Sequence, residues 1–297
     1  MSSSDSRAGF VAVIGAPNAG KSTLVNALVG QKVAIVSGKA QTTRARLMGI
    51  AIDGGAQILL VDTPGIFEPR RRLDRAMVQA AWSGAEDADL VLLVVDSSEP
   101  VREQVLEGLE KRRHPLFLAL NKIDLVKKER LLVLASMLTE RLKPDQIFMI
   151  SAAQGDGVAD LKAALAAALP EGPWLYPEDE VSDATDRMVA AELTREQLYE
   201  QLHQELPYAS AVETETWEER DDGSTAIRQQ ILVARDSQKA IVIGKGGRRL
   251  KEIGQKAREA IAEHLGRKVH LFLHVKVNPR WEDDRSLYQD IGLEWSD

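Results

Sequence analysis

The sequence predicts an α/β domain with a mostly parallel sheet, followed by a smaller α+β domain. In the first half, short β-rich apolar runs alternate with longer amphipathic segments, which is typical of a parallel sheet covered on both faces. This alternation stops at residues 170–177, which hold three prolines and a glycine. Beyond that break the element order changes. A chain of 297 residues is also long for a single core and suits two domains.

The first half contains predicted strands and helices in alternation. The strands are expected at residues 10–14, 47–52, 57–61, 90–95, 116–120 and 147–150. The helices are expected at residues 21–29, 73–85, 101–112, 129–141 and 158–169. Ligands of such sheets bind outside the carboxyl ends of the strands, so residues directly after each strand are the first candidates for a site.

Domain boundaries follow from these patterns. We expect a polar tail at residues 1–9, an α/β domain at 10–169, a linker at 170–184 and an α+β domain with a C-terminal extension at 185–297. The last domain reads as a helix at 186–206, strands at 212–217 and 227–233, helices at 237–243 and 248–265, and a strand at 269–277.

Composition narrows the class of protein. The chain has no Cys, which excludes disulfides and thiolate chemistry and fits a reducing cytoplasm. No apolar run approaches the roughly 20 residues needed to cross a bilayer, so we expect a soluble protein. The net charge of −7 argues weakly against nonspecific nucleic-acid binding. Residues 228–280, however, carry 13 Lys and Arg against 4 Asp and Glu, so one region is strongly basic.

Residues 15–22, GAPNAGKS, match the phosphate-loop pattern GxxxxGK[ST] between a predicted strand and a predicted helix. Small residues let backbone N–H groups surround a triphosphate at the helix amino terminus. Lys21 is expected to contact the β- and γ-phosphates, and Ser22 to supply an oxygen to Mg²⁺. The alternative is a chance glycine-rich turn. The expected phosphate contacts are Gly15, Ala16, Pro17, Asn18, Ala19, Gly20, Lys21, Ser22 and Thr23.

Two further segments follow strand ends. In residues 62–65, DTPG, Asp62 can hold Mg²⁺ and the Gly65 N–H can meet the γ-phosphate; alone, this segment could be a β-turn. In residues 121–124, NKID, the Asp124 carboxylate can accept both N1–H and the amine of guanine, a pair that adenine lacks. The Lys122 stem can lie over the ring, and Asn121 is a further expected nucleotide contact. Ser151 and Ala152, after the next strand, would complete the pocket through a backbone N–H.

Residues 244–247, GKGG, form a GxxG loop between two predicted helices in the basic region. Such a loop lets the backbone approach a sugar–phosphate chain, although an isolated GxxG can be a plain helix–helix turn. Bases would lie over an apolar floor, whereas His270, Phe272 and His274 on the non-core face of the last strand are expected to face solvent. The expected RNA contacts are Gly244, Lys245, Gly246, Gly247, Arg248 and Arg249.

The four nucleotide segments, in this order, resemble the translation-factor-related GTPases, and residues 41–44, QTTR, resemble the first switch of the Era branch. That resemblance implies that Thr43, or else Thr42, coordinates Mg²⁺ with GTP bound; the alternative is a polar surface loop. Ile66 occupies the place of the water-orienting Gln of Ras, so hydrolysis is expected to be slow without help. Asn18 either holds a K⁺ ion near the phosphates, as in related GTPases, or only shapes the loop. The resemblance thus assigns catalysis to Lys21, Thr43, Gly65 and Asn18.

The second half resembles a KH domain of the bacterial arrangement (type II), and the combination resembles the Era family over essentially the whole chain. The resemblance implies GTP/GDP and Mg²⁺ as ligands, the 3′ end of small-subunit ribosomal RNA and the small ribosomal subunit as partners, and no DNA. It implies a place in the cytoplasm and at the inner face of the membrane. A rival reading is a signalling switch whose basic module docks on a protein or membrane; an ATP-driven enzyme is disfavoured by Asp124.

Overall fold

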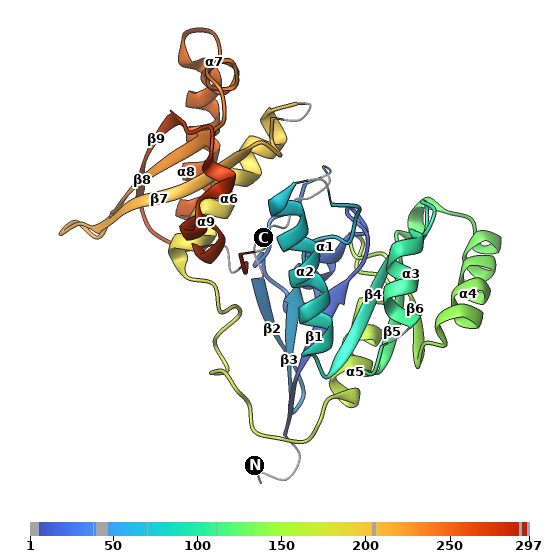
Figure 1. Ribbon diagram of the computed structural model, residues 1–297. Coiled ribbons are helices and arrows are strands. Elements are labelled where there is room, and N and C mark those ends of the chain that lie inside the picture. The colour runs from blue at the N-terminus through green and yellow to red at the C-terminus, as the bar shows by residue number, and fades with distance from the viewer. Residues whose placement is uncertain are drawn as a thin grey trace. The chain divides into compact units, whose positions relative to one another are not determined.

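The computed structural model describes residues 6–37, 39, 47–69, 71–110, 112–203, 206–290 and 293–295, with residues 286, 289 and 290 described by their backbone alone. These residues form two compact units, which divide between Asp183 and Ala184 (Figure 1). Each unit has its own sheet and its own buried core.

The first unit is built on a six-stranded sheet in the order β2-β3-β1-β4-β5-β6. Strands β1, β3, β4, β5 and β6 are parallel, and β2 pairs with β3 in the antiparallel sense. The predicted mostly parallel sheet is therefore confirmed. The strands are β1 (Arg7–Ile14), β2 (Leu47–Asp53), β3 (Ala56–Asp62), β4 (Leu90–Asp96), β5 (Leu116–Asn121) and β6 (Gln146–Met149).

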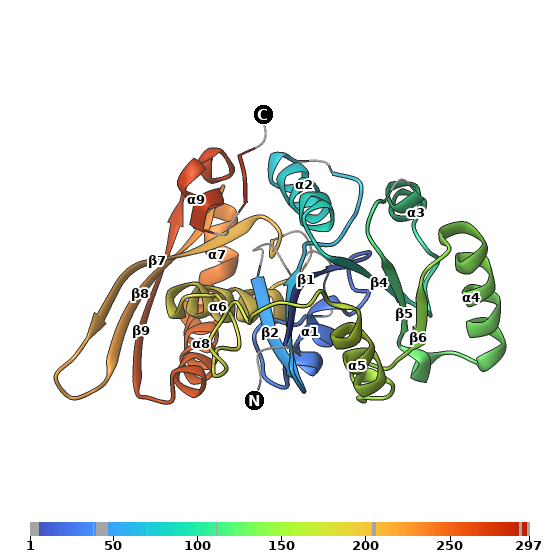
Figure 2. The same cartoon turned by 90° about the horizontal axis from the view of Figure 1, so that it is seen from below.

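Helices cover both faces of this sheet (Figure 2). One core joins Leu24 of α1 and Leu161 of α5 to the strands, and another joins Ala81 of α2, Leu106 of α3 and Leu138 of α4 to the opposite face. With both faces covered, the loops at the carboxyl ends of the parallel strands remain as the place for a site. The helices are α1 (Lys21–Val29), α2 (Arg72–Glu86), α3 (Glu103–Glu110), α4 (Lys128–Leu142) and α5 (Val158–Ala168), with a 3₁₀ turn η1 (Ile123–Leu125).

The second unit has a three-stranded sheet in the order β7-β8-β9, in which β7 and β8 are antiparallel and β8 and β9 parallel. Its core packs Leu198 and Leu202, Ile253 and Val275 together, so helices cover one face of the sheet. The elements are α6 (Asp186–Gln201), β7 (Ser210–Glu219), β8 (Thr225–Val233), α7 (Asp236–Ile243), η2 (Lys245–Gly247), α8 (Arg248–Leu265), β9 (Val269–Val277), η3 (Trp281–Asp283) and α9 (Arg285–Asp290).

The structure differs from the sequence prediction at both ends of this unit. Helix α6 ends at Gln201 instead of residue 206, because Leu202 is extended and Pro207 follows closely. Helix α9 was not predicted; its six residues are too few for a periodic pattern, although Leu287 and Tyr288 are buried. Among the described residues, no helix has both the length and the apolar character to cross a membrane.

Residues 170–183 run along the outer strands of the first sheet and are fastened there. The Trp174 indole N–H donates to Gly55 O at 2.9 Å, and the Ile50 N–H donates to Val181 O at 2.8 Å. The Met48 N–H donates to Asp183 Oδ1 at 3.2 Å. We call residues 170–183 the strap, because backbone and side-chain bonds hold it to β2 and β3.

Gln57 is the buried anchor of the strap. Its Nε2 donates to Tyr176 O at 2.8 Å, and its Oε1 accepts from the N–H groups of Leu175 and Tyr176 at 2.8 and 3.1 Å. We expect Gln57→Ala to lower the free energy of unfolding of the first unit by about 1–3 kcal/mol, because it leaves backbone groups of the strap without partners. Denaturant unfolding measures this.

Proteolysis gives a second measurement of the same variant. Cleavage within residues 174–180 is expected to become faster when Gln57 is replaced, since a loosened strap opens its backbone to the protease. Gln104→Ala, at an exposed glutamine of α3, is the matched control. Unfolding and cleavage equal to those of the control would contradict the anchoring role.

Candidate functional site

The phosphate loop lies between β1 and α1, and its backbone is curled. Gly15 and Gly20 have φ of +151° and +93°, and Asn18 has a left-handed φ of +65°. Helix α1 begins at Lys21, so its free N–H groups and the positive end of its dipole lie beside the loop. The structure therefore places a ready anion-binding turn where the sequence predicts one.

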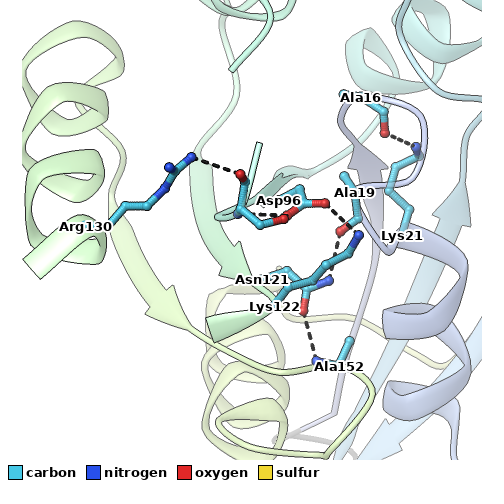
Figure 3. Close-up of polar contacts among 9 residues, drawn as sticks. Ala16, Ala19, Lys21, Asp96, Asn121, Lys122, Arg130 and Ala152 are labelled. Atoms are coloured by element: carbon cyan, nitrogen blue, oxygen red, sulfur yellow. Dashed lines mark hydrogen bonds and ion pairs between the residues drawn. The ribbon is translucent and has the colours of Figure 1, made fainter. Parts of the chain in front are cut away.

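Lys21 is buried within this loop, with 6% of its surface exposed. Its Nζ donates to Gly15 O at 3.3 Å and to Ala16 O at 3.1 Å (Figure 3). Burial lowers the pKa of Lys21 to about 8, against a smaller raising effect of the Asp62 charge. The ammonium group is thus held inside the cradle, and its charge depends on pH near neutrality.

Ser22 and Asp62 meet at the start of α1. The Ser22 hydroxyl donates to Asp62 Oδ2 at 2.7 Å, and the Asp62 carboxylate is fully buried at the end of β3. Mg²⁺ prefers oxygen ligands and is held by one or two protein groups together with substrate phosphates. This pair of oxygens beside the phosphate loop fits such a site. Among the described residues there is no cluster of three or more His, Asp or Glu side chains that could hold a metal alone.

The DTPG segment packs directly on the phosphate loop. The Thr63 hydroxyl donates to Val13 O at 2.8 Å, and the Ile66 N–H donates to Gly15 O at 3.0 Å. A Cβ added at Gly65 would lie 2.7 Å from Pro17 N and 2.8 Å from Pro17 Cα. Only glycine allows this close approach, so the Gly65 N–H lies next to the loop that would hold the γ-phosphate.

Asn121 joins the phosphate loop to the loop after β6. Its Nδ2 donates to Ala19 O at 2.8 Å, and its Oδ1 accepts from the Ala152 N–H at 2.9 Å (Figure 3). The side chain is 2% exposed. The predicted phosphate and base segments are therefore brought together by one buried amide.

Lys122 and Asp124 lie on the turn that follows Asn121. Lys122 has a left-handed φ of +63°. Its Nζ pairs with Asp96 Oδ2 at 2.6 Å. The Ser151 hydroxyl donates to Asp124 Oδ1 at 2.6 Å, which orients the exposed carboxylate expected to read guanine.

Asp96 is a site residue that sequence reasoning missed. It ends β4 and accepts from Lys122 and from the N–H and hydroxyl of Ser98. Burial raises its pKa, but these hydrogen bonds and the Lys122 charge outweigh that effect, so the pKa is lowered and the group stays ionised. Arg130 of α4 fastens the same turn by donating to Ser97 O at 2.8 Å and to Ser98 O at 3.0 Å. The position of Asp96 at the end of an apolar strand was the feature of the sequence that could have identified it.

A cavity of about 750 Å³ opens beside the phosphate loop, and the base-pocket residues Asn121, Asp124, Ser151 and Ala152 are not part of its lining. The lining includes Asn18 and Lys21 of the phosphate loop, Gly65, Asp96 and Lys122. Ala16, Pro17, Gly20, Ser22 and Thr23 line it as well. The predicted switch residues Gln41, Thr42, Thr43 and Arg44 lie outside the described residues.

The GxxG loop of the second unit is also in place. Gly244, Gly246 and Gly247 have φ of +70°, +62° and +76°, and α8 begins directly after them at Arg248. A Cβ at Gly244 would lie 2.8 Å from Arg249 Cβ, whereas a Cβ at Gly246 meets nothing within 4 Å. Beside the loop Ile241 is 49% exposed, while Ile253 is buried in the core. The loop therefore presents a bare backbone and an exposed apolar residue.

Comparisons with known proteins agree with both units. Residues 10–122 match the family described as 50S ribosome-binding GTPase, and residues 205–282 match the KH domain family. The chain is 58% identical over 302 residues to GTPase Era of Erythrobacter litoralis, covering 99% of each chain. It is 59% identical over 292 residues to GTPase Era of Afipia carboxidovorans, covering 97% of this chain and 95% of that protein.

The chain belongs to the Era family of GTPases. A crystal structure of Era in complex with MgGDPNP and nucleotides 1506–1542 of 16S ribosomal RNA has a TM-score of 0.91 and 37% identity, covering 97% of this chain and 99% of that one. A single-residue variant of Aquifex aeolicus Era bound to GDP·AlF4⁻ has a TM-score of 0.90, also at 37% identity, covering 96% and 99%. The predicted P-loop GTPase domain and KH domain of the Era family are confirmed.

The lowered pKa of Lys21 predicts proton uptake on nucleotide binding. At pH 8 about half of the ammonium groups are deprotonated in the free protein, and bound phosphates restore the charge. We expect about 0.5 proton to be taken up per nucleotide at pH 8, and affinity to fall as pH rises above 8. Calorimetry in buffers of different ionisation enthalpy measures the uptake. Lys21→Met should abolish it; the same uptake in that variant would contradict the assignment.

Proposed function

We propose that this chain binds and hydrolyses GTP in its first unit and binds the 3′ end of small-subunit ribosomal RNA through its KH domain. The single observation that supports the nucleotide site best is the buried Asn121 amide, which joins the phosphate loop to the loop of Ser151 and Ala152. It supports a single site that combines a phosphate cradle with a base-reading carboxylate. On this proposal the chain acts in the cytoplasm during assembly of the small ribosomal subunit.

Different groups of the first unit bind the phosphates and Mg²⁺. Backbone N–H groups of residues 15–23, other than Pro17, surround the phosphates, and the Lys21 ammonium neutralises the β- and γ-phosphates. Mg²⁺, held by Ser22, Asp62 and Thr43, would stabilise the charge that develops on the phosphate oxygens. The Gly65 N–H meets the γ-phosphate and is released when phosphate leaves. Ile66 has no side-chain amide to place the attacking water, so these contacts only position the substrate and the chain hydrolyses GTP slowly.

The guanine base lies between the Lys122 stem and the loop of Ser151 and Ala152. The Asp124 carboxylate accepts the two adjacent donors of guanine, while its Oδ1 also accepts from the Ser151 hydroxyl. On this proposal the guanine oxygen shares the Ala152 N–H, which donates to Asn121 Oδ1 at 2.9 Å. ATP offers no such donor pair, so this site selects GTP.

The RNA partner is supported by the relative of known structure. That Era protein binds nucleotides 1506–1542 of 16S ribosomal RNA, and it resembles this chain over 97% of its length. The GxxG loop would grip about four single-stranded nucleotides, with Lys245, Arg248 and Arg249 facing their phosphates. A KH domain favours this reading over a protein-docked signalling switch. Binding of the full chain at the inner face of a membrane, tested by vesicle flotation, would be an additional property.

The nucleotide state would set how the KH domain is presented. On this proposal, γ-phosphate contacts through Thr43 and Gly65 order the switch loops, and the ordered form binds RNA better. RNA affinity measured with a non-hydrolysable GTP analogue and with GDP tests it. Equal affinities would remove the gating and leave both binding activities in place.

Asp124→Asn is expected to change the base specificity. Because the Ser151 hydroxyl donates to one oxygen, the Asn oxygen would keep that bond and its NH₂ would face the base. GTP affinity should fall about 100-fold, since a charged hydrogen bond is lost and two donors meet. Xanthosine triphosphate, which has a carbonyl in place of the amine, should gain affinity. Equilibrium binding of GTP and of xanthosine triphosphate measures this change of specificity, with Asp160→Asn on α5 as the control. Unchanged GTP binding would refute the role of Asp124.

Gly246→Asp is expected to weaken RNA binding at least about 10-fold through repulsion of phosphates. The site has open space around it, and Asp tolerates the left-handed φ, so the unit should still fold. Gly246→Asn is the matched variant, with the same size and no charge. Filter binding to a 16S 3′-end oligonucleotide gives the affinities. If the two variants bind RNA with equal affinity, the phosphates do not approach this loop. GTP binding should stay unchanged in both variants.

We further propose that Asn18 holds a K⁺ ion beside the phosphates. Its side chain lines the cavity next to Pro17 and Lys21. Hydrolysis should then be faster in K⁺ than in Na⁺, and Asn18→Gly should remove the difference while keeping the left-handed backbone. Steady-state phosphate release measures the rates. Equal rates in the two salts, or a K⁺ effect that survives in Asn18→Gly, would leave Asn18 with a purely conformational role.

A further inference from the structure

One face of β9 carries a stripe of basic and aromatic side chains. At alternate positions from residue 268 to residue 276 the chain has Lys268, His270, Phe272, His274 and Lys276. Lys268, Phe272, His274 and Lys276 are exposed, and His270 is half-buried. Alternate residues of a strand share one face, so these five side chains form a continuous row that contains no acidic group. We call them the β9 stripe.

The β9 stripe lies on the face of the sheet that the helices leave uncovered. Core contacts to α6, α7 and α8 involve Leu273, Val275 and Val277 of β9, together with Ile231 and Val233 of β8. The stripe residues alternate with these and point the other way. In Figure 2 the sheet of β7, β8 and β9 has α6 and α8 on one side. The stripe is thus separate from the face that packs the GxxG helices.

Arg228 of β8 completes the surface. It is the direct cross-strand neighbour of Phe272, and its Cζ lies 5.0 Å from the centre of the Phe272 ring. Phe272 remains 44% exposed despite this contact. An exposed ring beside a guanidinium is the arrangement on which an unpaired nucleobase stacks, with the cation near its phosphate.

Charge on the neighbouring strand limits where a polyanion can lie. Glu215 of β7 is 3.6 Å from His274 Nδ1, and Glu213 accepts from Gln230 on the same side of the sheet. A phosphate chain would avoid the β7 side and follow β9, where Lys268 and Lys276 lie at opposite ends of the stripe. In the described part of the chain no strand pairs with the outer edge of β9, so a strand of RNA can pass from the helix side over this edge.

We propose that the β9 stripe with Arg228 is a second contact for single-stranded RNA, in which a base stacks on Phe272 and flanking phosphates meet Lys268 and Lys276. This inference rests on the RNA binding proposed above and extends it to nucleotides beyond those held at the GxxG loop. The ligand of the β9 stripe is a segment of unpaired nucleotides. The stripe recognises it by stacking and by charge and makes no base-specific hydrogen bonds.

RNA length separates the two contacts. The full chain is titrated with a 16S 3′-end oligonucleotide of about four nucleotides, which fills a GxxG groove, and with one of about ten. Phe272→Ala should weaken binding of the longer RNA roughly 5- to 100-fold and leave the shorter one unchanged. Phe272→Tyr keeps a stacking ring and should restore binding. Lys268→Ala with Lys276→Ala should lower the salt dependence for the longer RNA only.

Lys256→Ala is the matched charge control, because Lys256 is exposed on α8, which packs on the opposite face of the sheet. Its loss should not affect the difference between the two RNAs. The inference is overturned if Phe272→Ala binds both RNAs as the unchanged chain does, which would also be the result if a protein occupied the stripe. A different result would contradict the proposed RNA binding at the GxxG loop: Gly246→Asp would then bind the shorter RNA as tightly as the unchanged chain does.

Discussion

The buried side chain of Asn121 is the contact on which the nucleotide site depends. Its two hydrogen bonds, of 2.8 and 2.9 Å, join Ala19 and Ala152, which are far from each other along the chain. A buried amide without its partner costs about 1–3 kcal/mol, so the bonds resist any change in the separation of the two loops. That separation has to match one nucleoside between phosphates and base. The Lys122–Asp96 and Ser151–Asp124 pairs then orient the side chains around this fixed frame.

The same sheet connects the site to the end of the first unit. Strand β2 follows the predicted first switch and is bonded through Met48 and Ile50 to Asp183 and Val181 of the strap. Gln57 of β3 holds the middle of the strap. A displacement of β2 must therefore move or break bonds to the residues that lead into the KH domain. The strap, which leads to the second unit, is therefore structurally a part of the nucleotide-binding unit.

The second unit uses one sheet for two surfaces. Alternation along β9 sends Leu273 and Val275 into the core and Phe272 outward, where it meets Arg228. The core side supports the helices that present the GxxG loop, while the opposite side remains charged and aromatic. A small domain can in this way contact more of an extended ligand than a single loop would allow.

The sequence by itself determined the fold class, the order of the elements and most of the candidate site. A phosphate loop, a DTPG turn, an NKxD turn and a GxxG loop each need particular residue types at short spacing, so they are readable locally. Tertiary structure alone decided the tie at Asn121, the pairing of Asp96 with Lys122, the fastening of the strap by Gln57 and the ring of Phe272 beside Arg228. These contacts join residues distant in the chain, and only packing of the strands brings their polar groups within bonding distance.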